Sequence, residues 1–350
     1  MRRRLLLFLS LLLLVAPSLR AGEFKFPLKS NSVRFAAIGD MGTGDAAQYE
    51  VAQRMVGTRQ GFPFDFVIML GDNIYGGSSP SDFEKKFAVP YKPLLDTGVQ
   101  FYAALGNHDN PNQRFYKLFN MNGATYYTFK KGNVRFFVLD SNNMDPKQLA
   151  WLEAQLQSAG SGDWKICYFH HPLYSSGRTH GPATDLRLLL EPLFMKYGVD
   201  IVFAGHEHVY ERVQAQKGIY YFTEGASGQL RYGNLNKSDI TGKGFDTDRT
   251  FMLVEIAGED MYFQTISRAG ATVDSGVIRR TARVKTAAAP AAAHSRSAPR
   301  RMIRRKRAGI LPAPPLVPPT RGGVALDHRQ QLATGVTFAG GALLASTGKA

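Results

Sequence analysis

The feature of this sequence that most constrains its fold is a series of short apolar runs that each stop at a polar turn. Six runs have this form: Val33–Ile38, Phe66–Leu70, Phe101–Leu105, Phe136–Leu139, Ile166–Phe169 and Ile201–Ala204. Their length and apolar composition are typical of buried β-strands. Four of the turns begin with glycine, which lets the backbone bend sharply beside a polar side chain. The pattern therefore predicts a sheet whose polar side chains gather where the strands end.

Helices are expected between these strands. The candidates are Ala46–Thr58, Asp82–Leu95, Pro146–Ser158 and Asp185–Tyr197. The third is the clearest, because proline suits the first helical turn and three leucines fall on one face. Alternating strands and helices predict an α/β body. Three later strand-like runs are expected to complete a second sheet: Gly218–Thr223, Thr250–Ile256 and Met261–Ile266.

The formal net charge of +15 suggests a nucleic-acid binder at first sight, but the charge is concentrated at the two ends of the chain. The first 20 residues contain four arginines and no acid, and residues 285–350 contain eleven basic residues and one acid. The remainder has 28 basic against 27 acidic residues. The basic run at 300–307 has no aromatic residues between its charges, so we expect weak attraction to anionic surfaces and no specific nucleic-acid binding.

The N-terminus has the order of a secretory signal peptide. Arg2, Arg3 and Arg4 precede an apolar run that ends before Pro17, and Ala21 offers a cleavage site. The apolar run is short for a bilayer span, which disfavours the alternative of an uncleaved membrane anchor. We therefore expect a signal peptide over 1–21, a folded domain over 22–284, a basic tail rich in alanine, proline and arginine over 285–350, and a secreted or periplasmic location.

A single cysteine, Cys167, excludes an internal disulfide. It lies within an apolar run, so a buried, small hydrophobic role is expected rather than a nucleophilic one. A body of this size does not require disulfides to build a stable core.

The polar ends of the strands bring together side chains that bind hard or borderline cations. They are Asp40, Asp72, Tyr75, Asn107, His108, His170, His206 and His208. Asp72 could bridge two ions through its two oxygens, and His206 and His208 could each reach one of them. Two cations about 3.5 Å apart can activate water and stabilise the attacking and leaving oxygens of a phosphoryl transfer.

These residues form five ordered blocks that resemble those of the calcineurin-like metallophosphoesterases. The blocks are Gly39-Asp40-Met41-Gly42, Gly71-Asp72-Asn73-Ile74-Tyr75, Gly106-Asn107-His108-Asp109, His170 and Gly205-His206-Glu207-His208. Any block alone is a weak signal, whereas five in order are specific. The resemblance implies a four-layer α/β/β/α sandwich with two mixed β-sheets.

Two details make the chain resemble the purple acid phosphatases in particular, and among them the smaller, tartrate-resistant members. Gly42 stands where many family members have a histidine ligand, and the second block ends in Tyr75. In the purple acid phosphatases this tyrosine binds ferric iron. The resemblance therefore implies Fe(III) together with a divalent ion, which is iron, zinc or manganese.

The resemblance also implies a role for each position. Asp40, Tyr75 and His208 match the ferric ligands, Asp72 the bridging ligand, and Asn107, His170 and His206 the divalent-ion ligands. His108 matches a residue that contacts the phosphate and protonates the leaving group, and His180 matches a second active-site histidine. If the fourth block is shifted by one residue, His171 replaces His170 as the ligand.

Four nearby polar residues are expected to have supporting roles. Asp109 is predicted to orient His108 or nearby backbone, and Glu207 to face away from the ions or support its loop. Asp140 and Asn142 end a strand close to the site, where a supporting role and a simple turn role are equally compatible with the sequence.

The expected function is that of an acid phosphatase that cleaves small phosphate monoesters by attack of a metal-bound hydroxide. A phosphodiesterase or nucleotidase with the same ions is the first alternative, and a preference for diesters would reveal it. A non-catalytic secreted binder is the second, although all seven ligand positions hold competent residues. A nucleic-acid binder is the third, and it predicts salt-dependent binding that depends on the tail. The sequence does not predict an oligomeric state.

Overall fold

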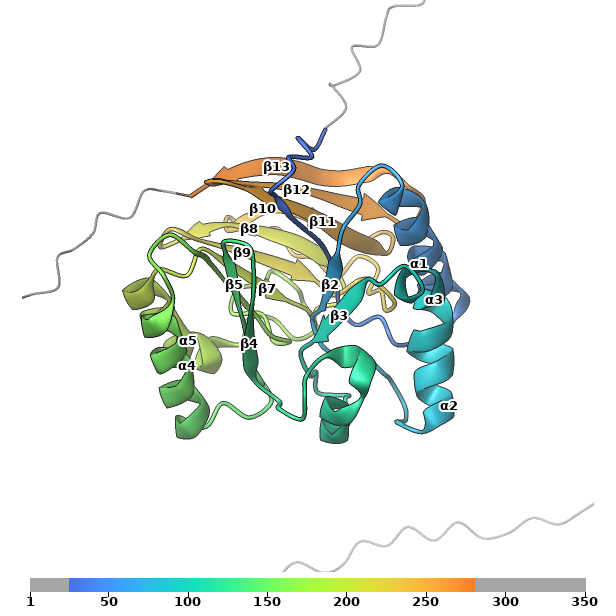
Figure 1. Ribbon diagram of the computed structural model, residues 1–350, viewed down its shortest axis with the longest axis horizontal. Helices are drawn as coiled ribbons and strands as arrows, with labels where there is room; N and C mark the ends of the chain where they lie inside the picture. The colour runs from blue at the N-terminus through green and yellow to red at the C-terminus, as the bar shows by residue number, and fades with distance from the viewer. Residues whose placement is uncertain (1–24, 281–350) are drawn as a thin grey trace, which may run out of the picture. The chain divides into compact units, whose positions relative to one another are not determined.

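The computed structural model describes residues 25–280, which form two mixed β-sheets (Figure 1). The first sheet has the order β13-β12-β11-β1-β2-β3 and the second β10-β8-β9-β7-β6-β5-β4. The strands of the first are β1 (Val33–Ile38), β2 (Phe66–Met69), β3 (Gln100–Ala103), β11 (Thr250–Ala257), β12 (Asp260–Ser267) and β13 (Thr272–Arg279). Those of the second are β4 (Tyr127–Lys131), β5 (Val134–Val138), β6 (Trp164–Tyr168), β7 (Ile201–Ala204), β8 (Tyr210–Gln216), β9 (Ile219–Glu224) and β10 (Thr241–Phe245).

Each sheet contains a parallel core with antiparallel strands at its side. In the first sheet β1, β2 and β3 are parallel, and in the second β5, β6, β7 and β9 are parallel. All six predicted apolar runs are strands within these cores. Because the carboxyl ends of parallel strands lie at one edge, the polar turns that follow them gather there.

One expectation about the sheets is wrong. Of the three later runs, only β9 joins the second sheet, whereas β11 and β12 extend the first sheet, with β11 antiparallel to β1. The run that forms β11 is buried almost throughout, so its composition shows that it is a strand but not which neighbour it pairs with.

The helices lie on the two outer sides of the sheet pair, in the expected four layers (Figure 1). Helix α1 (Ala46–Arg59), α2 (Pro80–Phe83) and α3 (Val89–Leu95) cover the first sheet; α4 (Pro146–Ser158) and α5 (Thr184–Tyr197) cover the second. The segment predicted as one helix over 82–95 is divided by a π-helical turn at Glu84–Ala88. Short 3-10 turns follow β3 at Pro111–Phe115 and Lys117–Phe119.

The main core lies between the two sheets and is rich in aromatic side chains. Phe35 and Phe66 of the first sheet pack edge to face against Phe136 of the second, with ring centres 5.4 and 5.5 Å apart. Cys167 is fully buried within the layer under α4 and α5, as expected. This rigid sandwich holds the edge at which the polar loops meet. The predicted signal peptide and basic tail lie outside the described residues.

Candidate metal centre

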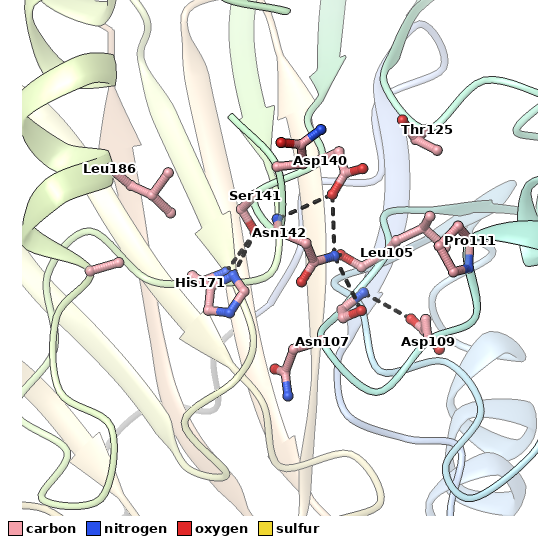
Figure 2. A pocket seen from close by; sticks show the side chains of 13 residues that line it. Leu105, Asn107, Asp109, Pro111, Thr125, Asp140, Ser141, Asn142, His171 and Leu186 are labelled. Carbon is pink, nitrogen blue, oxygen red and sulfur yellow. Dashed lines mark hydrogen bonds between the residues drawn. The ribbon is translucent and has the colours of Figure 1, made fainter. Parts of the chain in front are cut away.

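The loops that follow β3, β5 and β6 surround a cavity of about 790 Å³ (Figure 2). Its lining comprises Leu105, Gly106, Asn107, Asp109, Pro111, Thr125, Asp140, Ser141, Asn142, Asn143, His171, Ala183 and Leu186. Two of these residues also touch the predicted metal ligands. Asn107 Oδ1 lies 3.0 Å from His170 Nε2, and the ring centre of His171 lies 4.4 Å from that of His206. The cavity therefore adjoins the predicted centre.

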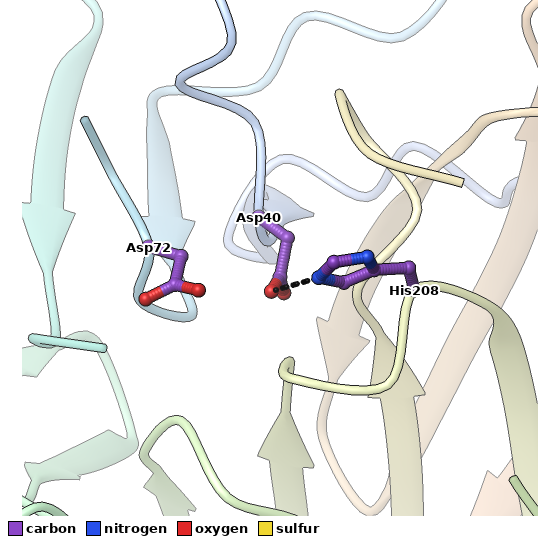
Figure 3. Close-up of side chains that lie close together, drawn as sticks. All are labelled: Asp40, Asp72 and His208. Atoms are coloured by element: carbon purple, nitrogen blue, oxygen red, sulfur yellow. Dashed lines mark ion pairs between the residues drawn. The ribbon is translucent and has the colours of Figure 1, made fainter. Parts of the chain in front are cut away.

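One group of donors contains the predicted ferric ligands. Asp40, Asp72 and His208 present ligand atoms that all lie within 4.8 Å of one another (Figure 3). The Tyr75 hydroxyl donates a 3.1 Å hydrogen bond to Asp40 Oδ1 and lies 3.3 Å from His208 Nε2. A phenol, an imidazole and two carboxylates thus converge on one point.

The second group contains the predicted divalent-ion ligands and shares Asp72 with the first. His170 Nε2 is at its centre, 3.0 Å from Asn107 Oδ1, 3.1 Å from His206 Nδ1 and 3.4 Å from Asp72 Oδ2. The structure therefore brings all seven predicted ligand side chains together in two adjacent groups, with Asp72 next to both. Their role as ligands remains a prediction.

Backbone conformation helps to aim these side chains. Asp40, Asp72 and His206 have left-handed φ angles of 53°, 51° and 70°, which are uncommon for residues with a Cβ and cluster at functional sites. The loops then fix one another, since His206 N–H donates to Asp40 Oδ2 at 2.8 Å and His108 N–H donates to Asp72 Oδ1 at 2.9 Å. A Cβ on Gly106 would collide with Asp72, so that position requires glycine.

The geometry distinguishes His170 from His171. His170 is fully buried, its Nδ1 lies 2.9 Å from the Leu70 carbonyl, and its Nε2 faces the donor group. His171 instead has its Nδ1 2.8 Å from Ser141 Oγ. A histidine whose outer nitrogen is held by a backbone carbonyl is the usual arrangement for a metal ligand. The arrangement favours His170.

The centre contains two buried carboxylates, which bound cations would stabilise. Asp40 and Asp72 are buried, and no lysine or arginine within 25–280 forms an ion pair with either. Burial is the largest single effect and disfavours the Asp72 carboxylate, but the hydrogen bond and positive charge of His170, with hydrogen bonds from the His108 N–H and Tyr75, together outweigh it and hold the pKa of Asp72 well below its usual range. Burial likewise opposes the charged form of His170, but the Asp40 and Asp72 carboxylates raise its pKa to about 9. Buried carboxylates are normally paired or bound to metal, so the donor set fits two bound ions.

The charges of the centre also shift the pKa values of Tyr75 and His206. Burial, together with the neighbouring Asp40 and Asp72 carboxylates, raises the pKa of Tyr75 well above its usual value. Burial and the charge on His170 lower the pKa of His206 to about 2. A cation at each position would favour the phenolate and the neutral imidazole, which are the forms that coordinate metals.

The two predicted catalytic histidines lie at the rim of the donor groups. The ring centres of His108 and Tyr75 are 5.0 Å apart, and those of His180 and His206 are 4.1 Å apart. Both are therefore beside the centre, on loops that follow different strands. His108 is solvent-exposed, so a substrate can reach it.

Glu207 has a larger supporting role than its sequence context indicates. Its buried carboxylate accepts hydrogen bonds from the backbone N–H groups of His180 and Gly181 at 2.7 and 2.6 Å, and from Asn234 Nδ2 at 2.8 Å. Glu207 thus connects the loop of His206 and His208 to the loop of His180. Its position between two predicted ligand histidines is the only sign of this role in the sequence, because the three long-range hydrogen-bond partners have no local sequence pattern.

Asp109 is also a supporting residue. Its carboxylate accepts from the backbone N–H groups of Asn73, Ile74 and Gly106 at 2.9 to 3.0 Å. It therefore holds the Asp72 and Asn107 loops against each other. Its hydrogen bonds come from these backbone groups and from the side-chain amides of Asn73 and Gln113, rather than from the His108 ring. Asp140 forms a turn, accepting from the Asn142 N–H at 3.1 Å, while Asn142 Nδ2 donates to the Gly106 carbonyl at 3.2 Å.

Sequence comparison finds relatives over most of the chain. Residues 33–210 match the family model described as calcineurin-like phosphoesterase. The tartrate-resistant acid phosphatase type 5 of Homo sapiens is 26% identical, and the match covers 79% of this chain and 98% of that protein. Purple acid phosphatase 7 of Arabidopsis thaliana is 25% identical, covering 76% and 97% respectively.

Solved structures share the fold. A purple acid phosphatase from yellow lupin seeds superimposes with a TM-score of 0.61 at 19% identity, covering 73% of this chain and 55% of that one. GAP50, described as the anchor in the inner membrane complex of Plasmodium, gives 0.62 at 20% identity, covering 71% and 89%. Within residues 25–280, the helices are all too short or too polar to span a bilayer.

Proposed function

This chain belongs to the calcineurin-like phosphoesterase family, and from that premise we propose that it is an acid phosphatase that hydrolyses small phosphate monoesters at a dinuclear centre. The observation that carries the proposal is the convergence of seven donor side chains from separate loops into two adjacent groups around Asp72. The similarity to acid phosphatases of animals and plants supports the same activity.

Asp40, Tyr75 and His208 would hold Fe(III), Asn107, His170 and His206 would hold a divalent iron, zinc or manganese ion, and Asp72 would bridge them. Two such ions supply Lewis-acid charge and an activated water. The Tyr75 phenol is found only in the group assigned to Fe(III). We assign the more highly charged ion to that group because hard, highly charged cations favour oxygen donors.

The chain's own residues provide orientation and a proton. His108, at the rim beside Tyr75, is placed to contact a phosphate oxygen and to donate its proton to the leaving oxygen as a general acid. His180 contacts the substrate from the opposite loop, with its position set by Glu207. Asp109 keeps the loops of Asp72 and Asn107 at a fixed separation.

A phosphodiesterase is the second candidate, because the adjoining cavity of about 790 Å³ has room for an additional ester group. Comparing 4-nitrophenyl phosphate with bis(4-nitrophenyl) phosphate decides between the two. A higher kcat/KM for the monoester supports the phosphatase, and a higher value for the diester replaces it.

The metal assignment is tested on the purified mature protein by metal analysis and visible absorption, with Tyr75→Phe beside the wild type. Two metals per chain and a broad visible band that disappears in Tyr75→Phe are expected. A colourless, active protein with two metals would retain the phosphoesterase and remove the ferric site. A protein that binds no metal under any reconstitution would overturn the proposal. Secretion or export to the periplasm is proposed from the N-terminal sequence.

A further inference from the structure

The cavity beside the metal centre has an unusual balance of charge. None of its thirteen lining residues is lysine or arginine, and two are aspartates, Asp109 and Asp140. Asp109 is not available to a ligand, because both its oxygens accept hydrogen bonds from backbone or amide groups of the protein. Asp140 is therefore the acidic group of this cavity that a ligand can meet.

Asp140 retains capacity for a ligand. Its Oδ1 accepts from the Asn142 backbone N–H at 3.1 Å and from Asn142 Nδ2 at 3.2 Å. The Thr125 hydroxyl and the Asn143 backbone N–H also interact with the carboxylate, and these neutral donors hold it in place without cancelling its charge. Within 25–280, no lysine or arginine forms an ion pair with it. Asp140 is only partly buried, so its negative charge faces the cavity without a protein counterion.

Asp140 lies across the cavity from the predicted metal centre, where it could contact the alcohol part of a bound phosphate ester. Figure 2 shows Asn107 at one end of the lining and Asp140 at the other, with Ser141 and Asn142 between them. Asn107 belongs to the predicted metal ligands, and the neighbouring His108 is the proposed proton donor to the leaving oxygen. An alcohol that leaves beside His108 could therefore extend past Asn107 into the cavity. Leu105, Pro111 and Leu186 give this space apolar walls.

From these features we infer that the cavity binds the alcohol portion of phosphate monoesters. We further infer that Asp140 favours alcohols that carry a positive charge, such as amino alcohols. The inference rests on the proposed phosphatase activity and adds a substrate class to it. An apolar stem would pack against the leucine and proline walls while an ammonium group pairs with Asp140. Esters whose alcohol carries a carboxylate or a further phosphate would meet an uncompensated negative charge.

The test uses three aryl phosphates of similar size and leaving-group chemistry with the metal-loaded full chain. They are 4-(aminomethyl)phenyl phosphate, 4-ethylphenyl phosphate and 4-(carboxymethyl)phenyl phosphate, which differ in the charge of one remote group. The wild type should favour the cationic ester over the anionic one by about tenfold in kcat/KM, as expected for one partly exposed charge contact with each substrate. Asp140→Asn should reduce that ratio to about twofold, while Asp96→Asn, a remote exposed aspartate, should leave it unchanged.

A second variant keeps the test independent of any effect of Asp140→Asn on folding. Leu186→Lys places a positive charge on another wall of the same cavity and should shift the preference towards the anionic ester. The ratio of kcat/KM between two substrates is measured on one preparation, so it does not depend on how much metal each variant carries. Equal ratios in wild type, Asp140→Asn and Leu186→Lys, with normal hydrolysis of the neutral ester, would overturn the inference alone. A wild type that hydrolyses none of the three would overturn the proposed function and this inference with it.

Discussion

The carboxylate of Glu207 accepts a 2.7 Å hydrogen bond from the backbone N–H of His180, and so joins two loops that are far apart in sequence. Glu207 stands between two predicted ligands, and the loop it holds carries a predicted catalytic residue. The position of His180 therefore depends on a residue that itself has no part in the chemistry.

This relationship predicts a graded response at position 207. Glu207→Ala leaves two backbone N–H groups and the Asn234 amide without their acceptor, so kcat should fall at least tenfold and the melting temperature should drop by several degrees. Glu207→Gln keeps one oxygen acceptor and should lose much less. Glu153→Gln, at a partly exposed glutamate far from the centre, is the matched control. Equal kcat in Glu207→Ala and wild type, at equal metal content, would contradict the role.

His108 should be identifiable by its dependence on the leaving group. His108→Asn removes the proton donor, and loss of a general acid lowers rates by about 10²–10⁴. The loss should be greatest for alkyl phosphates, whose leaving oxygen is strongly basic, and smallest for 4-nitrophenyl phosphate, whose leaving oxygen needs little protonation. A loss of the same size for both substrates would show that His108 only binds the phosphate.

The choice between His170 and His171 can be made by counting metals. His170→Ala removes a buried nitrogen that faces Asn107, His206 and Asp72, and we expect it to retain at most one metal per chain. His171→Ala removes a ring held by Ser141 and should keep both metals. Metal analysis after dialysis against a weak chelator provides the measurement. The reverse result would place the ligand one residue later in the chain.

How much could be predicted from sequence differed between parts of the molecule. The parallel strands and their polar ends were predictable, because each is a local pattern of apolar residues followed by a turn. The pairing of β11 with β1 was not, since it joins residues more than 200 positions apart and a fully buried strand carries no facial pattern. The strands β4, β8, β10 and β13 were missed, because their alternation is weak and mixed with charged or glycine residues.

In the site, too, local patterns could be predicted from the sequence and long-range contacts could not. Most of the donor residues lie next to glycine, and all of them lie in blocks of fixed order, so their types and order could be recognised. The choice between His170 and His171, the three partners of Glu207 and the unpaired charge of Asp140 all depend on contacts between separate loops. Such contacts are fixed by the packing of the two sheets and have no local signature.

Glycine is required at 106 for a steric reason that can be tested against a second glycine. A Cβ on Gly106 would overlap Asp72 Oδ1 and the Asp72 backbone, so Gly106→Ala should displace Asp72, the predicted bridging ligand, lower the metal content and reduce activity. A Cβ on Gly57 in α1 meets nothing within 4 Å, so Gly57→Ala should stabilise the protein by about 1 kcal/mol through its helix propensity. Normal metal binding in Gly106→Ala would refute the steric argument.

Glu224 should make the metal-free protein less stable as the pH rises. Burial, with Asp40 nearby, raises the pKa of Glu224 from 4.5 to about 8, although hydrogen bonds from Thr250 and Ser227 oppose this shift; Thr250 Oγ1 donates to Oε1 at 2.6 Å. Between these two pH values the unfolded chain loses a proton that the native state keeps. The stability that protonated Glu224 contributes is therefore fully present below pH 4.5 and decreases up to pH 8, by at most about 5 kcal/mol. Glu224→Gln should therefore raise the melting temperature more at pH 8 than at pH 5 in chelator-treated protein. An equal change at both values would show that Glu224 is ionised in the native state.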